Sequence, residues 1–99
     1  MEKIKKACDI SPKIREEVRK RDNDRCIVCG GIGQQIAHFI SRGRLGLGIP
    51  HNLAVMCVKC HFEYDNGRLH RQIEKVFREH LKAHYPEWNE KELTYSKWR

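Results

Sequence analysis

Two Cys-x-x-Cys pairs constrain this chain more than any other feature. The pairs are Cys26 with Cys29 and Cys57 with Cys60. Four soft thiolates in two knuckles form the closed tetrahedral set that holds a structural zinc ion. A redox dithiol is the competing use of such a pair, but two pairs without a thioredoxin-like βαβ pattern argue against it. We therefore predict that these cysteines bind Zn²⁺ and leave no coordination position open for a substrate.

Zinc is expected to supply stability that the size of the chain does not. The chain has 99 residues, which predicts one domain over 1–99 with a small hydrophobic core. Domains of this size commonly need an internal cross-link. Because the free energy of binding zinc becomes free energy of folding, we expect the metal-free chain to be poorly folded.

The charge of the chain indicates a polyanionic partner. Lys and Arg outnumber Asp and Glu by 20 to 13, which gives a net charge of +7. A zinc ion on four thiolates lowers this charge only slightly, so the domain stays basic. Charge alone also fits a basic surface that has no specific partner.

The cysteine usage indicates a reducing compartment. The chain has 5 cysteines, an odd number, and four of them have metal spacing rather than the pattern of a disulfide scaffold. The first ten residues, MEKIKKACDI, lack the apolar segment of a signal peptide, and no apolar run reaches the roughly 18 residues of a membrane span. We predict a cytoplasmic protein in which Cys8 is a small buried residue or a free thiol.

Patterning along the chain predicts an α+β fold of short elements. Ser11 and Pro12 indicate a helix start, as N-cap and first-turn residue. Short apolar stretches at 34–41 and 52–56 suit two β-strands. Apolar residues at helical spacing from Leu69 to Leu81 predict an amphipathic helix, which Pro86 ends. The expected segments are a helix at about 12–22, packed on the zinc core, a core at about 22–67 that ends in a helix at 59–67, a helix at about 68–84, and an aromatic tail at 85–99 that folds back onto the body.

Four polar side chains lie between the cysteine pairs or just after them. They are His38, Asn52, His61 and Asp65. His61 and Asp65 are four residues apart, so on a helix an imidazole and a carboxylate would face one ion. A neutral imidazole suits the removal of a proton from water, and a divalent cation suits the charge that develops on a leaving oxygen. The other histidines are expected at the surface: His51, His70, His80 and His84.

The segments AHFISR and HNLAVMCVKCH and the cysteine spacing resemble the zinc-stabilised HNH endonucleases, whose core is the ββα-metal (His-Me finger) unit. The resemblance covers residues 22–67 and is closest to small proteins of phages and prophages. It implies a treble-clef-like ββα core held by the four-cysteine zinc and flanked by N- and C-terminal helices. It also implies a metal-dependent DNA endonuclease that leaves 5′ phosphate and 3′ hydroxyl ends, beside phage packaging or recombination proteins in a bacterial host.

The resemblance implies a role for each polar position. His38 matches the general base that takes a proton from the attacking water. Asn52 matches the asparagine that fixes the loop, and its amide would orient the His38 ring. His61 matches a ligand of the catalytic ion, which would be Mg²⁺ or Mn²⁺, or else Ni²⁺ or Zn²⁺, and Asp65 falls where many members have a further ligand. The 27 residues between the cysteine pairs would then be the hairpin and loop that carry the base to the metal-bearing helix.

Ala37 departs from the family pattern. Many members have Asp or His immediately before the first histidine, where it also binds the metal, and this chain has Ala37. Phosphate and water, or else Asn52 or His51, would complete the shell of the ion. Either the metal arrives with DNA, which we favour, or catalysis is impaired.

Two functions therefore stay open. The first is a DNA endonuclease of little sequence specificity, in which Arg42 and Arg44 contact phosphate; solubility is the simpler explanation of these arginines. The second is a catalytically degenerate, zinc-stabilised module that binds DNA or protein. Ala37 favours the module, whereas the His-Asn-His order together with Asp65 favours the enzyme.

Overall fold

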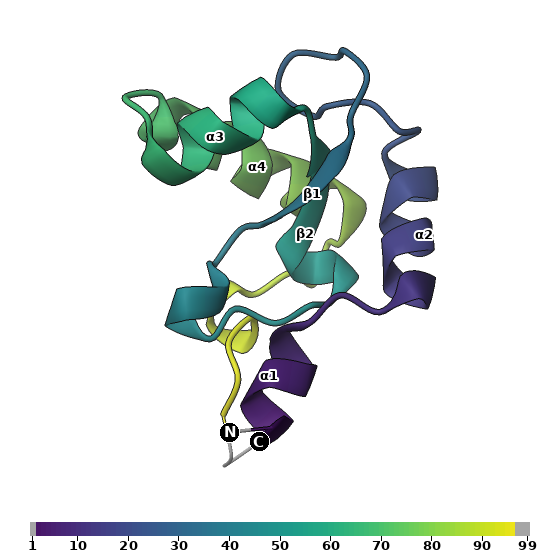
Figure 1. The fold of residues 1–99 in the computed structure, drawn as a ribbon, viewed down its shortest axis with the longest axis vertical. Helices are drawn as coiled ribbons and strands as arrows, with labels where there is room; N and C mark the ends of the chain where they lie inside the picture. The colour runs from purple at the N-terminus through teal and green to yellow at the C-terminus, as the bar shows by residue number, and fades with distance from the viewer. Residues whose placement is uncertain (1, 97–99) are drawn as a thin grey trace.

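The computed structural model describes residues 2–96, and Trp98 of the aromatic tail lies outside them. Within this part of the chain, two short strands are flanked by α-helices, which confirms the α+β class (Figure 1). No helix among these residues is long and apolar enough to cross a membrane. The elements are α1 (Glu2–Cys8), α2 (Pro12–Arg21), β1 (Gln35–His38), β2 (Leu53–Met56), α3 (Val58–Asn66) and α4 (His70–His84).

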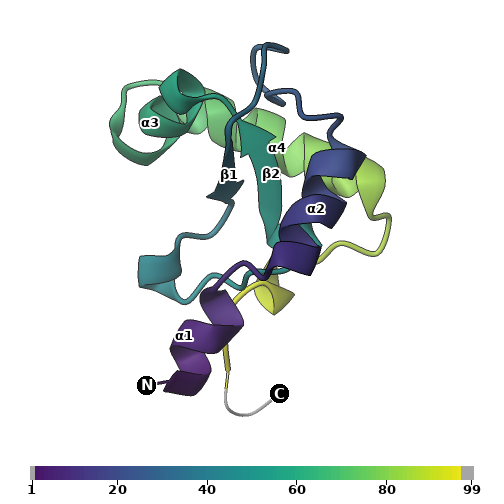
Figure 2. The same cartoon turned by 45° about the vertical axis from the view of Figure 1, so that its right-hand side comes forward.

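Helix α2 begins at the predicted N-cap. Ser11 Oγ accepts a hydrogen bond from the Ile14 N–H at 3.1 Å, and Pro12 occupies the first turn. Val18 is fully buried and packs, with Ile14, against the buried side chains of β2. Helix α2 therefore lies beside β2 (Figure 2). We expected it against the zinc core, but its narrow apolar stripe matches the strand face instead.

Strands β1 and β2 pair antiparallel, with Ala37 opposite Ala54 and His38 opposite Leu53. Successive side chains of a strand point to opposite faces. Ala37 is accordingly buried in the main core, whereas Ile36 and His38 line a surface pocket. All four residues of β2 are buried, so this strand fixes the position of β1, which pairs with it. His38 is the last residue of β1.

An aromatic cluster fills the space between the sheet, α3 and α4. Phe77 of α4 meets Phe39 edge-on, with 5.3 Å between ring centroids, and Tyr64 of α3 at 5.5 Å. Trp88 covers Phe39 at 5.6 Å, and its indole N–H donates to the His51 carbonyl at 2.7 Å. The described part of the aromatic tail therefore folds back onto the body, as its composition predicts.

Helix α1 occupies a stretch where we expected only a basic lead-in. It docks where the chain passes Gly48, whose N–H donates to the Ala7 carbonyl at 2.9 Å. A Cβ at position 48 would lie 2.1 Å from the carbonyl oxygen of Asp9, so only glycine permits this approach. Cys8, at the end of α1, is buried, and burial raises the pKa of its thiol.

Asp22, just after α2, joins three elements. Its buried carboxylate accepts hydrogen bonds from Arg21 at 2.7 and 2.9 Å, from the Val55 N–H at 2.9 Å and from His80 Nε2 at 2.8 Å. Burial opposes the charge of Asp22, but these hydrogen bonds outweigh it and hold the pKa of Asp22 well below its ordinary value. His80, which we expected at the surface, is therefore partly buried and links α4 to α2.

Candidate functional site

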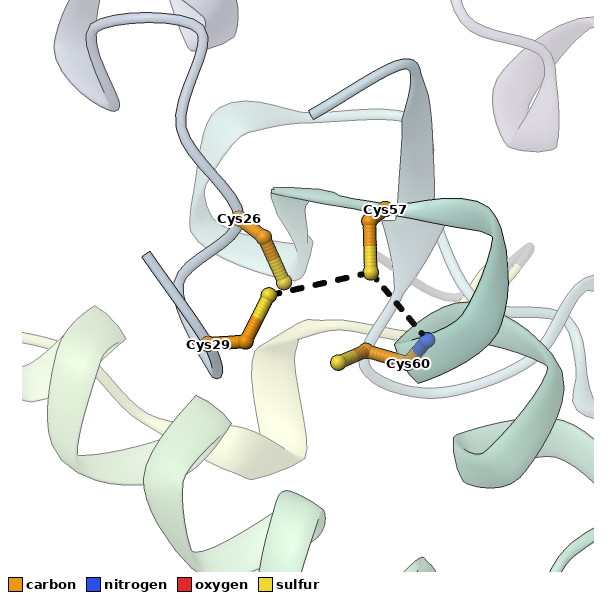
Figure 3. A group of neighbouring side chains, drawn as sticks. All are labelled: Cys26, Cys29, Cys57 and Cys60. Atoms are coloured by element: carbon orange, nitrogen blue, oxygen red, sulfur yellow. Dashed lines mark hydrogen bonds between the residues drawn. The ribbon is translucent and has the colours of Figure 1, made fainter. Parts of the chain in front are cut away.

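The two cysteine pairs meet at one point. Cys26 and Cys29 come from the loop before β1, whereas Cys57 and Cys60 come from the start of α3 (Figure 3). All four Sγ atoms lie within 4.8 Å of one another, and Cys29 Sγ is 3.8 Å from Cys57 Sγ. Two sulfurs bound to one tetrahedral zinc ion at the usual length of about 2.3 Å lie about 3.8 Å apart. The four side chains therefore fit zinc.

The backbone around the sulfurs favours thiolates. Gly30, at φ 77°, closes the first knuckle, and the Cys60 N–H donates to Cys57 Sγ at 3.4 Å. Burial opposes ionisation of Cys26, but backbone N–H groups of both knuckles lower the pKa of its thiol to about 7. Burial and the neighbouring sulfurs raise the pKa of Cys60. Because four packed thiols cannot all ionise without a cation, ionisation of the full set would accompany metal binding.

His38, His61 and Asp65 line one surface pocket of about 520 Å³. His38 comes from the end of β1, and the other two residues come from α3. The ββα order explains this convergence, because β1 pairs with β2 and β2 leads directly into α3. Ile10 and Arg42 form further parts of the wall. The pocket thus combines a base with two ligand-type side chains.

The backbone of α1 holds the His38 ring. His38 Nε2 lies 2.9 Å from the Cys8 carbonyl oxygen. Because a carbonyl only accepts, Nε2 carries the hydrogen and Nδ1 keeps the lone pair. Burial lowers the pKa of His38, with help from the charges of Arg42 and His61, and outweighs the bond to Cys8, which raises it. The imidazole is therefore neutral at pH 7, and Nδ1 can accept a proton. Sequence reasoning missed the Cys8 carbonyl because it did not predict α1.

His61 and Asp65 face each other across one turn of α3, with 3.3 Å between Nε2 and Oδ2. The other ring nitrogen, Nδ1, lies 2.7 Å from Oε1 of Gln35, a residue that sequence reasoning did not select. Within residues 2–96, the groups of three or more ligand-type side chains near one point do not include His61 and Asp65. They offer two ligand-type side chains, a set that would suit a hard divalent ion that keeps water or phosphate in its shell.

Asn52 fixes the loop between the strands. Its Oδ1 accepts from the Ile40 N–H at 2.8 Å, and its Nδ2 donates to the carbonyls of Ile40 at 3.1 Å and Leu47 at 2.8 Å. We expected this amide to orient the His38 ring, but the ring bonds to the Cys8 carbonyl instead. The Asn52 amide therefore holds the loop backbone that follows β1.

Asn52 and His51, the residues considered as extra metal ligands, are not among the described residues that line the pocket, and neither is Ala37, the position that departs from the family pattern. Ala37 is in the core, on the strand face opposite His38. The His51 ring stacks on Tyr85, with 3.9 Å between centroids, and approaches Glu87 at 3.4 Å. The Asn52 amide is also occupied, by the backbone of Ile40 and Leu47.

The two arginines of the glycine-rich loop differ in their surroundings. Arg42 pairs with the Asp9 carboxylate and donates to the Cys8 carbonyl at 3.3 Å. Arg44 is exposed in the short 3-10 turn Arg42–Arg44. Arg42 therefore holds α1 at the pocket wall, and Arg44 faces solvent, where a phosphate can reach it.

A second group of ligand-type side chains joins Asp22, His80 and His84, whose ligand atoms also lie within 4.8 Å of one another. N–H donors from Arg21, Val55 and His80 already occupy the Asp22 carboxylate. The Arg21 guanidinium also disfavours a second cation there. This group is therefore a structural network between α2 and α4.

Comparison with known proteins supports the fold. A solved structure similar to this chain is that of the Type IV phosphorothioation-dependent restriction endonuclease ScoMcrA, with a TM-score of 0.65 and 21% identity. The match covers 79% of this chain and 18% of that one, so this chain spans less than a fifth of that protein. No protein-family model and no curated protein match the sequence. At this identity, the likeness establishes a shared fold.

Proposed function

We propose that this chain is an HNH-type, metal-dependent DNA endonuclease, formed by one nuclease domain over residues 1–99. The observation that carries the proposal is that a neutral His38 shares one pocket with the ligand pair His61 and Asp65. A net charge of +7 suits DNA as substrate, and the solved structure of similar fold is a restriction endonuclease. We place the protein in the cytoplasm of a bacterial host, with a phage or prophage origin and packaging or recombination proteins as partners.

In the proposed reaction, His38 is the general base. A water in the pocket gives a proton to His38 Nδ1, and its oxygen forms a bond to the phosphorus. The bond from phosphorus to the 3′ oxygen breaks, and that oxygen takes a proton from solvent, which leaves 5′ phosphate and 3′ hydroxyl ends. The Cys8 carbonyl accepts from Nε2–H throughout, so it also stabilises the imidazolium that forms.

His61 Nε2 and Asp65 Oδ2 would hold the catalytic ion, Mg²⁺ or Mn²⁺, or else Ni²⁺ or Zn²⁺. When bound, this ion supplies Lewis-acid stabilisation of the phosphate and of the leaving oxygen. With two protein ligands, the site favours an ion that arrives with the DNA phosphate. Arg44 is placed to contact a neighbouring phosphate, and the zinc on the four cysteines has a structural role only.

The alternative is a catalytically degenerate module that binds DNA or protein. One observation favours it: Ala37, where many HNH enzymes have a ligand, is buried in the core. A module of this kind would keep the zinc fold and the basic surface. It would have no use for a neutral histidine beside a ligand pair.

Plasmid nicking separates the two functions. Zinc-loaded protein is incubated with supercoiled plasmid and Mg²⁺, Mn²⁺ or Ni²⁺. We expect the wild type to produce open circles and His38→Ala to produce none, although it keeps its zinc and its circular dichroism spectrum. Cys26→Ser serves as the unfolded control. Folded wild type that binds DNA but nicks it with none of these metals would favour the module.

A further inference from the structure

We propose that Gln35 is a positioning residue that sets the tautomer of His61 and so directs its lone pair at the catalytic ion. This inference rests on the proposed metal site at His61 and Asp65. Gln35 is the first residue of β1, and its side chain reaches α3, where Oε1 lies 2.7 Å from His61 Nδ1. This hydrogen bond between two side chains links β1 to α3, the helix that would hold the metal.

The chemistry of the contact decides which nitrogen of His61 is free. An amide oxygen accepts hydrogen bonds and cannot donate. With Oε1 facing Nδ1, the neutral ring carries its hydrogen on Nδ1 and its lone pair on Nε2. Nε2 is the nitrogen that lies 3.3 Å from Asp65 Oδ2. In the neutral ring, Gln35 thus places two electron-pair donors opposite each other, which is unfavourable unless a proton or a metal cation lies between them.

The spacing of these two donors suits one ion. Two ligands bonded at about 2.1 Å lie about 3.0 Å apart in octahedral geometry and about 3.4 Å apart in tetrahedral geometry. The distance from Nε2 to Oδ2, 3.3 Å, falls in this range. A ring in the other tautomer would present an N–H to the ion, and a ring turned over would present a C–H, so neither would bind it.

The tautomer and orientation of the His61 ring matter more here than they would in a site with three protein ligands. Ala37 supplies no ligand, so the pair His61 and Asp65 carries the whole protein contribution. The group that bonds to the far nitrogen of a metal-binding histidine typically contributes about 10- to 100-fold in metal affinity. We expect Gln35 to act within this range.

The chain offers a matched control, because Gln34 is exposed like Gln35, whereas the hydrogen bond described at His61 Nδ1 is made by Gln35. Gln35→Met removes the acceptor at similar length, whereas Gln35→Glu keeps an acceptor oxygen. Gln34→Met and Gln34→Glu make the same changes of size and charge one residue away. All variants are compared as zinc-loaded full chains with unchanged zinc content.

The first measurement is Mn²⁺ affinity by calorimetry, with and without a short DNA duplex, in a His38→Ala background that leaves the duplex uncut. We expect Gln35→Met to weaken Mn²⁺ binding about 10- to 100-fold. Gln35→Glu should bind at least as tightly as the parent and more tightly than Gln34→Glu. Gln34→Met should match the parent. Parent-like affinity in Gln35→Met would overturn the inference.

The second measurement is the tautomer of His61, read from the ¹⁵N chemical shifts of its ring. The protein carries zinc on its four cysteines and no ion at His61 and Asp65. We expect the Nδ1–H form in wild type and a shift toward Nε2–H in Gln35→Met, a change that a purely structural role would not produce. An Nε2–H ring in wild type would contradict the inference.

If the parent binds no Mn²⁺ even with DNA, the proposed metal site fails as well. If binding depends on Gln35 but no variant with His38 nicks DNA, the nuclease proposal alone fails.

Discussion

Asn52 hydrogen-bonds to both backbone groups of Ile40, accepting from its N–H at 2.8 Å and donating to its carbonyl at 3.1 Å. The two residues lie at opposite ends of the connection between β1 and β2. The amide therefore acts as an extra rung beyond the last strand pair, His38 with Leu53. This rung fixes the backbone on which the proposed general base stands.

Asn52→Ala should destabilise the zinc-loaded protein by about 2–4 kcal/mol, because it leaves the polar groups of Ile40 and the Leu47 carbonyl without a partner inside the protein. Urea unfolding measures this loss. Asn52→Asp should cost at least as much, since a carboxylate cannot donate to either carbonyl. Wild-type stability in either variant would contradict the role of the rung.

Removing one zinc ligand should unfold the chain. Cys26→Ser is expected to lose zinc and most of its helical circular dichroism signal, because zinc binding supplies folding free energy. Cys8→Ser is the matched control and should keep one zinc per chain, since Cys8 lies outside the cluster. Zinc affinity of the wild type should fall steadily as the pH is lowered, because zinc binding displaces the protons of the cysteine thiols. A folded, zinc-free Cys26→Ser would be the contrary result.

The Asp22 network should contribute far more to the free energy of unfolding than a surface ion pair does. Asp22→Asn is expected to lower the free energy of unfolding by about 3–5 kcal/mol at pH 7, because it leaves a buried Arg21 charge without its partner. Asp24→Asn breaks the exposed pair with Arg19 and should cost far less, because solvent and salt screen an exposed pair. Equal losses in the two variants would show that the network contributes nothing special.

The pH dependence of this contribution follows from the lowered pKa of Asp22. A carboxylate with a depressed folded-state pKa stabilises the protein above its ordinary pKa of 3.8, and the stabilisation is lost as the pH falls below that value. The loss caused by Asp22→Asn should therefore shrink as the pH falls below 3.8. Urea unfolding at several pH values checks this expectation.

Nicking should depend on a histidine that titrates below its ordinary value. Because burial lowers the pKa of His38, the neutral base persists at lower pH, and the acid limb of the single-turnover rate should have its midpoint below 6.5. Arg42→Gln removes a charge that lowers this pKa, so the midpoint should move to higher pH at saturating DNA. A midpoint above 6.5 in wild type would argue against His38 as the base.

Gly48→Ala should disturb the site from a distance. The new Cβ would lie 2.1 Å from the Asp9 carbonyl oxygen, so α1 must shift and the Cys8 carbonyl must leave His38. We expect a loss of about 1–3 kcal/mol in stability and a lower nicking rate. Gly43→Ala is the control, since its Cβ would meet nothing closer than Ser41 Oγ at 3.9 Å. Equal rates in the two variants would show that docking of α1 is irrelevant to the base.

Local sequence signals account for much of the fold. The cap at Ser11, the spacing of Ile73, Phe77 and Leu81, and the cysteine pairs each act over a few residues, so periodicity and motif spacing predict them. These features need no knowledge of distant contacts. The meeting of His38 with α3 was implied by the resemblance to the HNH endonucleases, and the ββα order of the elements brings it about.

The features that were missed depend on contacts between distant segments. The bond from His38 to the Cys8 carbonyl joins residues 30 positions apart, and a backbone carbonyl leaves no trace in the residue types. His80 meets Asp22 across 58 positions, and Gln35 meets His61 across 26. Helix α1 had a local signal in the spacing of Ile4, Ala7 and Cys8, but the high density of lysine obscured it.

The hydrogen bond between His38 and the Cys8 carbonyl means that the ββα motif alone does not contain every group that acts on His38. A gene fragment cut to the ββα motif would still encode the zinc ligands, the hairpin and the metal-bearing helix. It would lack the carbonyl that sets the proton on the base. Engineers who graft this motif onto other scaffolds would need to bring the amino-terminal helix, or to supply an acceptor in its place.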